Sequence, residues 1–552
     1  MKLFIAGFIT AVFIQSVFPQ VENVPAGHQV YPFLKRMQVK GALPDFDDMI
    51  VPLSKNEVIS ALDKIEGNIG LLSEADKEFL YRMKEKFSLN SSGIINILDN
   101  FPSRLGSNLV SVRQKHLYSF IDSSIAFFVD PVLEFKYIYS ASYKSSGLLN
   151  AGGVARGSYG GWFGFYLAGS NGTVYNRGEA AETDKRVAQS YTFNKTGINF
   201  FDETEGYLRL HKDIVNFQLG RERILWGRGS INKMILSDNP QPFDFIKFDI
   251  AYKTIRYDFI HAWLVLPRTV VFLDSLQSDA RDKGEKYFAA SRLSYTPNSD
   301  LSFGISQVII YANRAFEAAY LNPFLFWESA QRSLGDLDNS FLSLDARYKI
   351  LNGLEISSAI LIDDVQFGKL FKNWSNVQNR IAWQVSSIVS DPVIFPDFNL
   401  KLEYLQIRPY IFAHPGQGEA LTYTNNSYLL GFDLPPNSVR FSAEVDYLFS
   451  GKLNFSARYD HSIHGRNIYD ESGRLIKNVG GGLYENFWIS DSQTAPLLDG
   501  DREVMDYFSI ELNYELLYGL YFNLFYQYRS NVFKGIKSDD NIFWAAVKIN
   551  FE

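Results

Sequence analysis

The sequence predicts an all-β fold, a transmembrane antiparallel β-barrel of about eighteen strands preceded by a small three-helix bundle. Three observations predict it. Apolar and polar residues alternate with period two along many segments, short turns alternate with long polar connections, and Phe, Tyr and Trp make up 16% of the residues. Alternation of this kind is typical of strands, and membrane barrels use aromatic residues at their lipid-facing positions.

The clearest hairpin lies at residues 440–460. Its two arms alternate apolar with polar side chains, and Gly451 lies in the short turn between them. The polar face carries Arg440, Glu444, Asp446 and Arg458. A soluble sandwich would bury the apolar face against a second sheet, whereas an outer-membrane barrel would turn it to lipid and the charged face to a wet lumen.

The composition excludes several classes of protein. The chain has 552 residues and a formal net charge of -7, so it has no basic excess and we expect no nucleic-acid partner. It has no Cys, which excludes disulfides and thiolate metal sites. The His residues lack metal-ligand spacing, and the glycine clusters lack the helix that follows a phosphate-binding loop, so we expect no cofactor.

We expect three regions along the chain. Residues 1–20 are typical of a signal peptide, because Lys2 precedes an apolar run over residues 3–14. That run is too short for a transmembrane helix, which needs roughly 20 apolar residues. Residues 21–105 are predicted to form a periplasmic helical bundle or plug, and residues 106–552 the outer-membrane β-barrel.

Three amphipathic helices are predicted in the second region. The first carries apolar residues at helical spacing from Val30 and ends at Gly41. The second begins with Ser54 and Glu57 in the Ser-x-x-Glu pattern of a capping box, and Ser73 caps the third. A bundle of this size has a thin core, so we expect it to lean on the barrel.

Eight short turns are predicted to join sixteen strands. They lie at Asp130-Pro131, Lys212-Asp213, Tyr252-Lys253, 297–300, Asn352-Gly353, 390–392, 450–452 and Tyr518-Gly519. A strand before Leu117 and a closing strand that ends near Phe551 make eighteen, and residues 169–172 are a further candidate turn, which gives a range of about 16 to 20. Longer polar connections are predicted at 222–247, 267–286, 310–342, 407–439, 461–505 and 530–540. Tight periplasmic turns and long extracellular loops are typical of an outer-membrane barrel.

Several short motifs follow one another in a characteristic order. They are Val24-Pro25-Ala26-Gly27-His28, Tyr31-Pro32-Phe33-Leu34, Pro52-Leu53-Ser54, Leu219-Gly220-Arg221, Trp226-Gly227-Arg228-Gly229, Ser237-Asp238-Asn239-Pro240, Pro242-Phe243 and Leu321-Asn322-Pro323-Phe324. Together with the order of the three regions, they resemble the capsule-assembly Wzi family of outer-membrane proteins over nearly the whole mature chain. The resemblance implies an eighteen-stranded barrel plugged from the periplasm by helices, and a lectin-like role in attaching capsular polysaccharide to the cell surface.

The densest group of candidate binding residues comprises Arg221, Arg223, Trp226 and Arg228. Guanidinium groups pair bidentately with carboxylates and an indole stacks on the apolar face of a sugar, so the group is suited to an acidic polysaccharide. The alternative is a lumenal ion-pair cluster that ties the barrel wall to the plug or to a folded-in loop. Further aromatic residues in the presumed loops either form sugar-binding platforms or pack the loops. They are Phe371, Trp374, Tyr484, Phe487 and Trp488.

These observations predict a non-enzymatic outer-membrane protein that binds capsular or surface polysaccharide for its assembly and attachment. We expect a monomer surrounded by outer-membrane lipid. The alternative is a porin-like channel for solutes or exported polysaccharide, which an open lumen would favour. A barrel hydrolase is a third hypothesis, because Asp460, His461 and Ser462 are triad residue types, although they lie too close in sequence for ready triad geometry.

Overall fold

The computed structural model describes residues 20–89, 93–94, 116–176, 178–190, 199–266, 285–335, 338–364, 368, 373–392, 395–414, 418–488 and 490–551. Residues 1–19 of the predicted signal peptide and Phe371 lie outside these ranges, as does most of the stretch before Leu117 in which a strand is expected.

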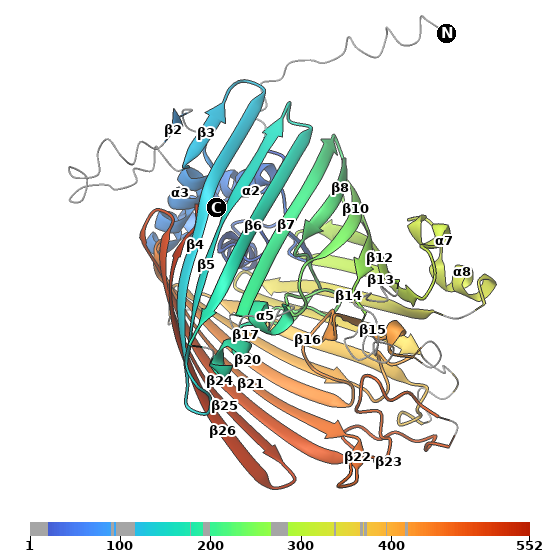
Figure 1. Cartoon of the computed structure of the whole chain (residues 1–552). Helices are drawn as coiled ribbons and strands as arrows, with labels where there is room; N and C mark the ends of the chain where they lie inside the picture. Colours follow the sequence, from blue (N-terminus) through green and yellow to red (C-terminus); the bar gives the residue numbers. More distant parts are fainter. Residues whose placement is uncertain are drawn as a thin grey trace, which may run out of the picture.

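Within the described residues, eighteen antiparallel strands form one closed barrel wall (Figure 1). They are β4 (Ile125–Ser140), β5 (Ser146–Tyr159), β6 (Phe163–Tyr175), β7 (Asn199–Lys212), β8 (Val215–Glu222), β10 (Phe243–Tyr252), β11 (Ile255–Leu264), β12 (Lys286–Asn298), β13 (Leu301–Ala312), β14 (Asn339–Leu351), β15 (Leu354–Asp364), β16 (Arg380–Ser390), β17 (Phe398–Ile407), β20 (Ser438–Ser450), β21 (Leu453–Arg466), β24 (Asp501–Leu517), β25 (Leu520–Phe533) and β26 (Ile536–Ile549). Each strand pairs with the next along the wall, and β26 pairs with β4 to close it. The predicted fold class is therefore confirmed.

The remaining elements are not part of this ring of strands. The helices are α1 (Val30–Lys40), α2 (Lys55–Gly67), α3 (Glu74–Phe87), α5 (Lys185–Gln189), α7 (Ala318–Leu321) and α8 (Trp327–Ser333), with single 3-10 turns at η2 (Ile69–Leu71), η3 (Glu179–Thr183) and η4 (Gly418–Leu421). The short strands are β1 (Ile50–Val51), β2 (Gly93–Ile94), β3 (Tyr118–Ile121), β9 (Leu225–Trp226), β18 (Thr424–Asn425), β19 (Tyr428–Leu429), β22 (Ile468–Tyr469) and β23 (Leu475–Lys477). No helix in the described part of the chain has the length and apolar character needed to cross a membrane.

The helix end predicted at Gly41 and the helix starts predicted at Ser54 and Ser73 are confirmed. Gly41 follows α1 with a φ of 86°, a left-handed conformation that glycine adopts readily. Ser54 and Glu57 form a reciprocal capping box at α2, and Ser73 forms another with Asp76 at α3.

Seven of the eight predicted short turns join wall strands at one end of the barrel, which we term the turn end. The turn predicted at Asp130-Pro131 is wrong, because both residues lie inside β4. Proline is tolerated at this position because one edge of β4 has no strand partner there. Along that edge, β4 pairs with β3 up to Val129 and with β26 from Leu133 onward. Residues 130–132 pair only with β5, on the other edge.

The candidate turn at residues 169–172 is also wrong. These residues lie in β6, and the turn instead joins β5 to β6 at Gly160 and Gly161, both with positive φ. A glycine inside a strand cannot be told from a glycine in a turn by sequence alone. Here β6 pairs with β5 along its whole length, so Gly169 and Gly172 are strand residues.

The opposite end of the barrel, which we term the loop end, carries the long connections. The connection predicted at residues 530–540 is wrong, because β25 and β26 continue to a tight turn at Lys534 and Gly535. The polar residues there belong to strands, so polarity alone does not mark a loop.

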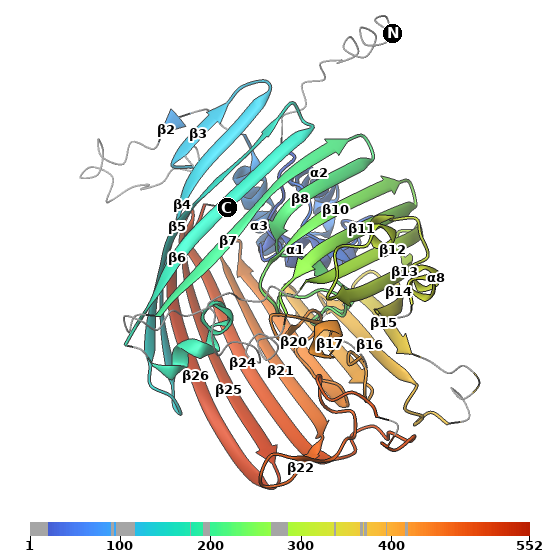
Figure 2. The same cartoon turned by 45° about the vertical axis from the view of Figure 1, so that its right-hand side comes forward.

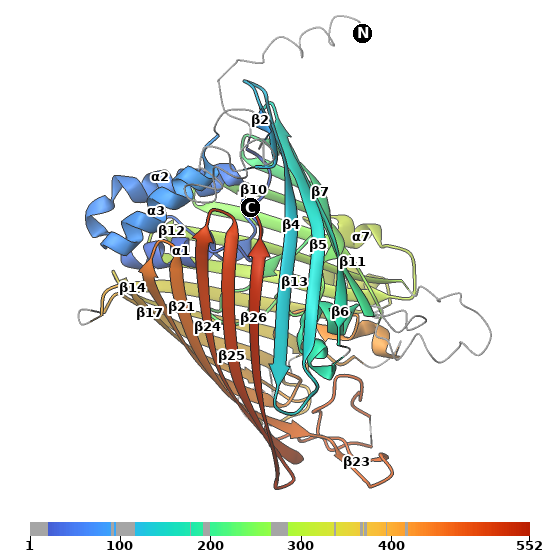
Figure 3. The same cartoon turned by 60° about the vertical axis from the view of Figure 1, so that its left-hand side comes forward.

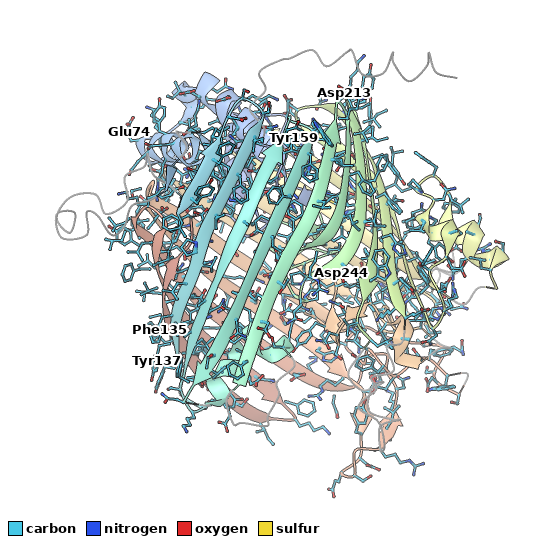
Figure 4. All side chains as sticks on the ribbon, turned by 45° about the horizontal axis from the view of Figure 1, so that its top comes forward. Glu74, Phe135, Tyr137, Tyr159, Asp213 and Asp244 are labelled. Carbon is cyan, nitrogen blue, oxygen red and sulfur yellow. The ribbon has the colours of Figure 1, made fainter. Side chains whose placement is uncertain are left out.

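Side chains on the wall alternate between two environments. Along β7, Leu208 and Leu210 point outward and are 52% and 42% exposed, whereas Tyr207 and Arg209 point inward and are buried. Exposed aromatic residues lie toward both ends of the outer surface, with Tyr159 near the turn end and Phe135 and Tyr137 nearer the loop end (Figure 4). An apolar outer band with aromatic girdles is the surface that a barrel presents to lipid.

The N-terminal helices and two loops that fold inward occupy the lumen on the side of β10 to β17. Helices α1, α2 and α3 lie at the turn end (Figures 2 and 3). Deeper in the barrel, Ile50 of β1 pairs with Trp226 of β9, so the N-terminal segment joins the loop at residues 223–242. One apolar core contains both of these segments, the loop at residues 408–437 and the inner wall. Its non-wall members are Met49, Ile50, Ile224, Trp226, Met234, Ile235, Leu236, Ile411, Phe412, Tyr423, Leu429, Leu430, Phe432 and Leu434.

Candidate functional site

A polar cleft lies beside the end of β7 that extends beyond its shorter neighbour β8. Strand β8 ends at Glu222, and its pairing with β7 stops at Gly206, so residues 199–205 of β7 extend beyond their neighbour. Helix α5 and the residues that lead into β10 lie beside this free edge. The cleft is partly open to solvent, and the space between its walls, with that open solvent counted in, is about 520 Å³. Its lining residues are Lys185, Arg186, Gln189, Asp202, Glu203, Thr204, Glu205, Arg221, Arg223, Asp238, Asn239, Pro240, Gln241 and Pro242.

Two of the four predicted site residues line this cleft. Arg221 points outward from β8 and pairs bidentately with Asp244, at 2.8 and 3.0 Å (Figure 4 labels Asp244). Arg223 contacts the backbone oxygen of Asp238 at 3.4 Å. Lys185 reaches the same residue, with 3.7 Å between its ammonium group and the Asp238 carboxylate. Because these contacts are long and exposed, they are weak. Arg223 and Lys185 can therefore release Asp238 and bind an acidic ligand in its place.

The inner side of the cleft is held by shorter contacts. Arg186 of α5 lies 2.6 Å from Glu134 and 2.9 Å from Asp184, which precedes the helix. Burial alone would raise the pKa of Asp184, but the hydrogen bonds from Arg186 and the charge of Lys136 outweigh it and hold that pKa below its ordinary value. Gln189 donates to the backbone oxygen of Asn239 at 2.7 Å, which joins α5 to the opposite side of the cleft.

Trp226 and Arg228 do not reach this cleft. Trp226 is buried in the lumenal core, and its strand β9 pairs with β1. Arg228 is also buried, 2.6 Å from Asp47 of the N-terminal segment and 3.1 Å from Asp345 of β14. The positions of these two residues match the alternative given in the sequence analysis. That alternative is a lumenal ion-pair cluster that joins the plug, the loop and the wall.

Similar ion pairs attach the N-terminal segment at several further points. On α1, Lys35 lies 2.6 Å from Glu355 of β15, and Arg36 lies 2.6 Å from Asp391 and 3.1 Å from Asp397 in the β16–β17 connection. On α3, Arg82 pairs with Glu515 of β24. The helices are therefore fixed to widely separated strands of the wall.

A further attachment point of the N-terminal segment lies at Glu22. Its carboxylate is fully buried, pairs with Lys55 at 3.0 Å, and accepts a short hydrogen bond from Ser158 of β5. Burial would raise the pKa of Glu22, but the charges of Lys55 and Arg156 and the Ser158 hydroxyl lower it below its ordinary value. A carboxylate of this kind stabilises the folded state above its unfolded pKa of about 4.3, and the contribution disappears as the pH falls through the folded-state pKa.

We therefore expect acid to weaken the folded state through Glu22. The urea midpoint of unfolding in detergent should fall as the pH is lowered from neutral to below about 4. The Glu22→Gln variant should have a lower midpoint at neutral pH and a shallower dependence on pH. Glu74→Gln is the matched control, because Glu74 is exposed at the start of α3 (Figure 4). Equal pH slopes for wild type and Glu22→Gln would contradict this expectation.

The loop aromatics divide between packing and exposure. Trp374 lies under the guanidinium of Arg408 at 4.8 Å, and Phe487 packs edge-on against the buried Tyr410 at 5.6 Å. Trp488, in contrast, is 67% exposed at the loop end. Trp488 therefore has the exposure that a sugar-stacking platform requires.

The three triad residue types are separated by the pleat of β21. Ser462 accepts from Arg440 and Asp460 pairs with Arg458 on the inner face, whereas His461 points outward to Asp506 at 2.8 Å. Successive residues of a strand face opposite sides, so His461 cannot act on Ser462.

The closed barrel, its apolar outer band and its occupied lumen define an outer-membrane β-barrel protein of the bacterial cell envelope. Residues 142–528 match the family model described as capsule assembly protein Wzi, so the chain belongs to the Wzi capsule assembly family, as the motif order predicts. Outer-membrane barrels have short turns on the periplasmic side and longer loops on the extracellular side, so we assign the turn end and the helices to the periplasm and the loop end to the outside.

Comparison with solved structures agrees with the fold. The Escherichia coli protein Wzi, described as an outer-membrane protein involved in group 1 capsule assembly and as a carbohydrate-binding β-barrel, superimposes with a TM-score of 0.57 at 11% identity, over 96% of this chain and 99% of that one. OprD of Pseudomonas aeruginosa gives a TM-score of 0.44 at 13% identity, over 76% of this chain and 94% of that one. No curated protein sequence matches the chain.

Sequence reasoning missed most of the cleft. Lys185, Gln189, Asp202 and Glu203 come from two separate segments and belong to none of the motifs. Asn239 lies in the motif at residues 237–240, but that motif does not indicate which segment it faces. Their only local signal is a polar stretch in a strand next to a charged loop, which occurs at many places in this chain.

Proposed function

We propose that this protein is a non-enzymatic, lectin-like barrel that binds capsular or another surface polysaccharide and attaches it at the cell surface. Membership of the Wzi family supports the proposal, as does the description of E. coli Wzi as a carbohydrate-binding β-barrel. The helices and loops that pack against the inner wall favour binding over transport through the barrel.

The observation that carries the proposal is the polar cleft beside α5. Amide, hydroxyl, carboxylate and guanidinium groups converge there, and these are the groups that exchange hydrogen bonds with sugar hydroxyls. Arg223 and Lys185 are the residues that we assign to contact with acidic groups of the polymer, with Arg221 at the margin. Trp226 and Arg228 position the loop that carries Arg223, and contact with the polymer is not part of their assigned role.

Binding at one cleft of this size would be weak for a single glycan unit. A polysaccharide repeats its units, so contacts at the cleft and at Trp488 add along one polymer and raise the overall affinity. Attachment would therefore depend on the length of the polymer as well as on its composition.

Surface-glycan staining of cells that lack the protein tests the proposal. We expect less cell-associated polysaccharide and more released polymer in the medium, with both restored by the wild-type chain. The double variant Lys185→Ala, Arg223→Ala should restore attachment only in part. Lys253→Ala, on a periplasmic turn, is the matched control and should restore it fully. Unchanged cell-associated and released glycan in cells without the protein would contradict the proposal.

A further inference from the structure

The segment between β13 and β14 lies on the outer surface of the barrel, outside the lumen. It contains α7 and α8, which stand beside β12 and β13 at the extracellular end of the wall (Figures 1 and 2). The loops at residues 223–242 and 408–437 fold inward instead, so this segment is placed differently. We term residues 313–335 the outer flap.

The outer flap packs on the outward side chains of three wall strands. Tyr320 and Trp327 of the flap are buried against a patch of the wall surface. The wall members of this cluster are Phe259, Tyr287, Ala289, Ile309 and Tyr311. Their neighbours along the strands, including Ile260, Phe288 and Ile310, point into the lumenal core, so this patch faces away from the lumen.

The wall beneath the flap is polar at positions where lipid would otherwise lie. Gln307 points outward from β13, donates to the backbone oxygen of Leu325 at 2.9 Å, and accepts from the backbone N–H of Trp327 at 3.1 Å. His261 lies 2.7 Å from the Tyr311 hydroxyl, which in turn accepts from the backbone N–H of Glu317 at 3.2 Å. Polar groups without partners are costly in the hydrocarbon region, and the flap supplies partners to both groups. The wall and the flap are therefore built to stay together.

The free surface of the flap carries several large apolar side chains. Phe316, Phe324 and Phe326 are 56%, 77% and 57% exposed, and Leu334 is 41% exposed. Phe324 stacks on Tyr257 of the wall at 5.8 Å, next to exposed wall residues such as Leu293 and Ile305, so the apolar surface of the flap continues the lipid-facing band.

The arginines of the flap pair with carboxylates of the flap or with Asp338, which lies just before β14. Arg314 lies 3.0 Å from Glu317 and 2.6 Å from Asp338, and Arg332 lies 2.8 Å from Glu328. This arrangement suits an uncharged occupant better than a charged protein or polysaccharide.

We propose that the outer flap inserts Phe316, Phe324 and Phe326 among the acyl chains of the outer leaflet and anchors the extracellular rim of the barrel there. The occupant of this surface is membrane lipid. The flap widens the apolar band on one side of the barrel, which fixes the depth and tilt at which the adjoining extracellular loops stand above the membrane.

The absence of cysteine from the chain allows a direct test with single-cysteine variants. An environment-sensitive fluorophore is attached at Phe324→Cys, at Leu344→Cys on the lipid-facing wall, and at Glu471→Cys in the extracellular β22–β23 turn. Each labelled protein is folded into phospholipid vesicles with and without lipids that carry a quencher on the acyl chain. Circular dichroism confirms that each variant is folded.

We expect acyl-chain quenchers to remove most of the fluorescence at Phe324→Cys, as at Leu344→Cys, with little loss at Glu471→Cys. Iodide in the aqueous phase should give the reverse order. Quenching of Phe324→Cys by iodide and not by lipid would overturn the proposal. Cross-linking of two Phe324→Cys chains to each other, with protection from both quenchers, would also overturn it and would assign the flap to contact between two copies of the chain.

Discussion

Replacing Arg228 by alanine is expected to lower the free energy of unfolding by about 3–5 kcal/mol, the usual cost of removing one partner from a buried charge network. Arg228 joins Asp47 of the N-terminal segment to Asp345 of β14, and Arg292 of β12 lies 2.8 Å from the same Asp345. Without Arg228, Asp345 keeps Arg292, but Asp47 loses its nearest cation. The N-terminal segment, the inner loop and the wall would then lose their common contact.

Arg221→Ala is the matched control for this prediction, because it removes the same type of side chain seven positions away. Arg221 pairs with Asp244 at an exposed position, where an ion pair is worth at most about 1 kcal/mol. Urea unfolding in detergent, followed by circular dichroism, measures both variants. Similar losses for Arg228→Ala and Arg221→Ala would contradict the structural role that we assign to Arg228.

The second large effect is expected in ion conductance. The wild-type protein should show no stable open current in a planar bilayer, because helices and in-folded loops occupy the lumen. The double variant Lys35→Ala, Arg36→Ala removes the ion pairs that attach α1 to β15 and to the β16–β17 connection, each worth about 3–5 kcal/mol if broken from one side. We expect this variant to show repeated openings as α1 moves away from the wall.

Lys64→Ala with Lys77→Ala is the control for conductance. Both side chains are on the helices, but they pair with exposed carboxylates of the N-terminal segment and make no ion pair with the described strands of the wall. This control should remain as closed as the wild type. Large stable currents from the wild-type protein would support the channel alternative and contradict the view of the lumen as permanently occupied.

Much of the wall could be predicted from sequence because the signals for it are local. Alternation with period two places Phe441 and Tyr459 outside and Arg440 and Arg458 inside, and the structure agrees. Turn pairs such as Asn352-Gly353 predict hairpins for the same reason, since the backbone conformation of a tight turn depends on only a few residues. The two turn predictions that were wrong concern proline and glycine inside strands, where pairing with a neighbour overrides local preference.

The candidate site was predictable only in part. The sequence places Arg221, Arg223, Trp226 and Arg228 within eight positions, which suggests a single cluster. The strand β8 ends at Glu222, and beyond it the chain turns inward, so the first two residues line an external cleft and the last two enter the lumen. Nearness in sequence does not report that change of direction.

The sequence by itself determined the barrel class, the three capped helices, most of the periplasmic turns and the sidedness of the strands, because each depends on residues that are neighbours along one element. Only the tertiary structure decided that Arg228 is a buried link, that the cleft lies beside α5, and that residues 313–335 lie outside the wall. Each of those outcomes depends on which distant segment supplies a partner: for a buried charge, for a free strand edge or for an outward polar side chain. Such pairing between residues far apart in the chain leaves no periodic pattern in a single sequence.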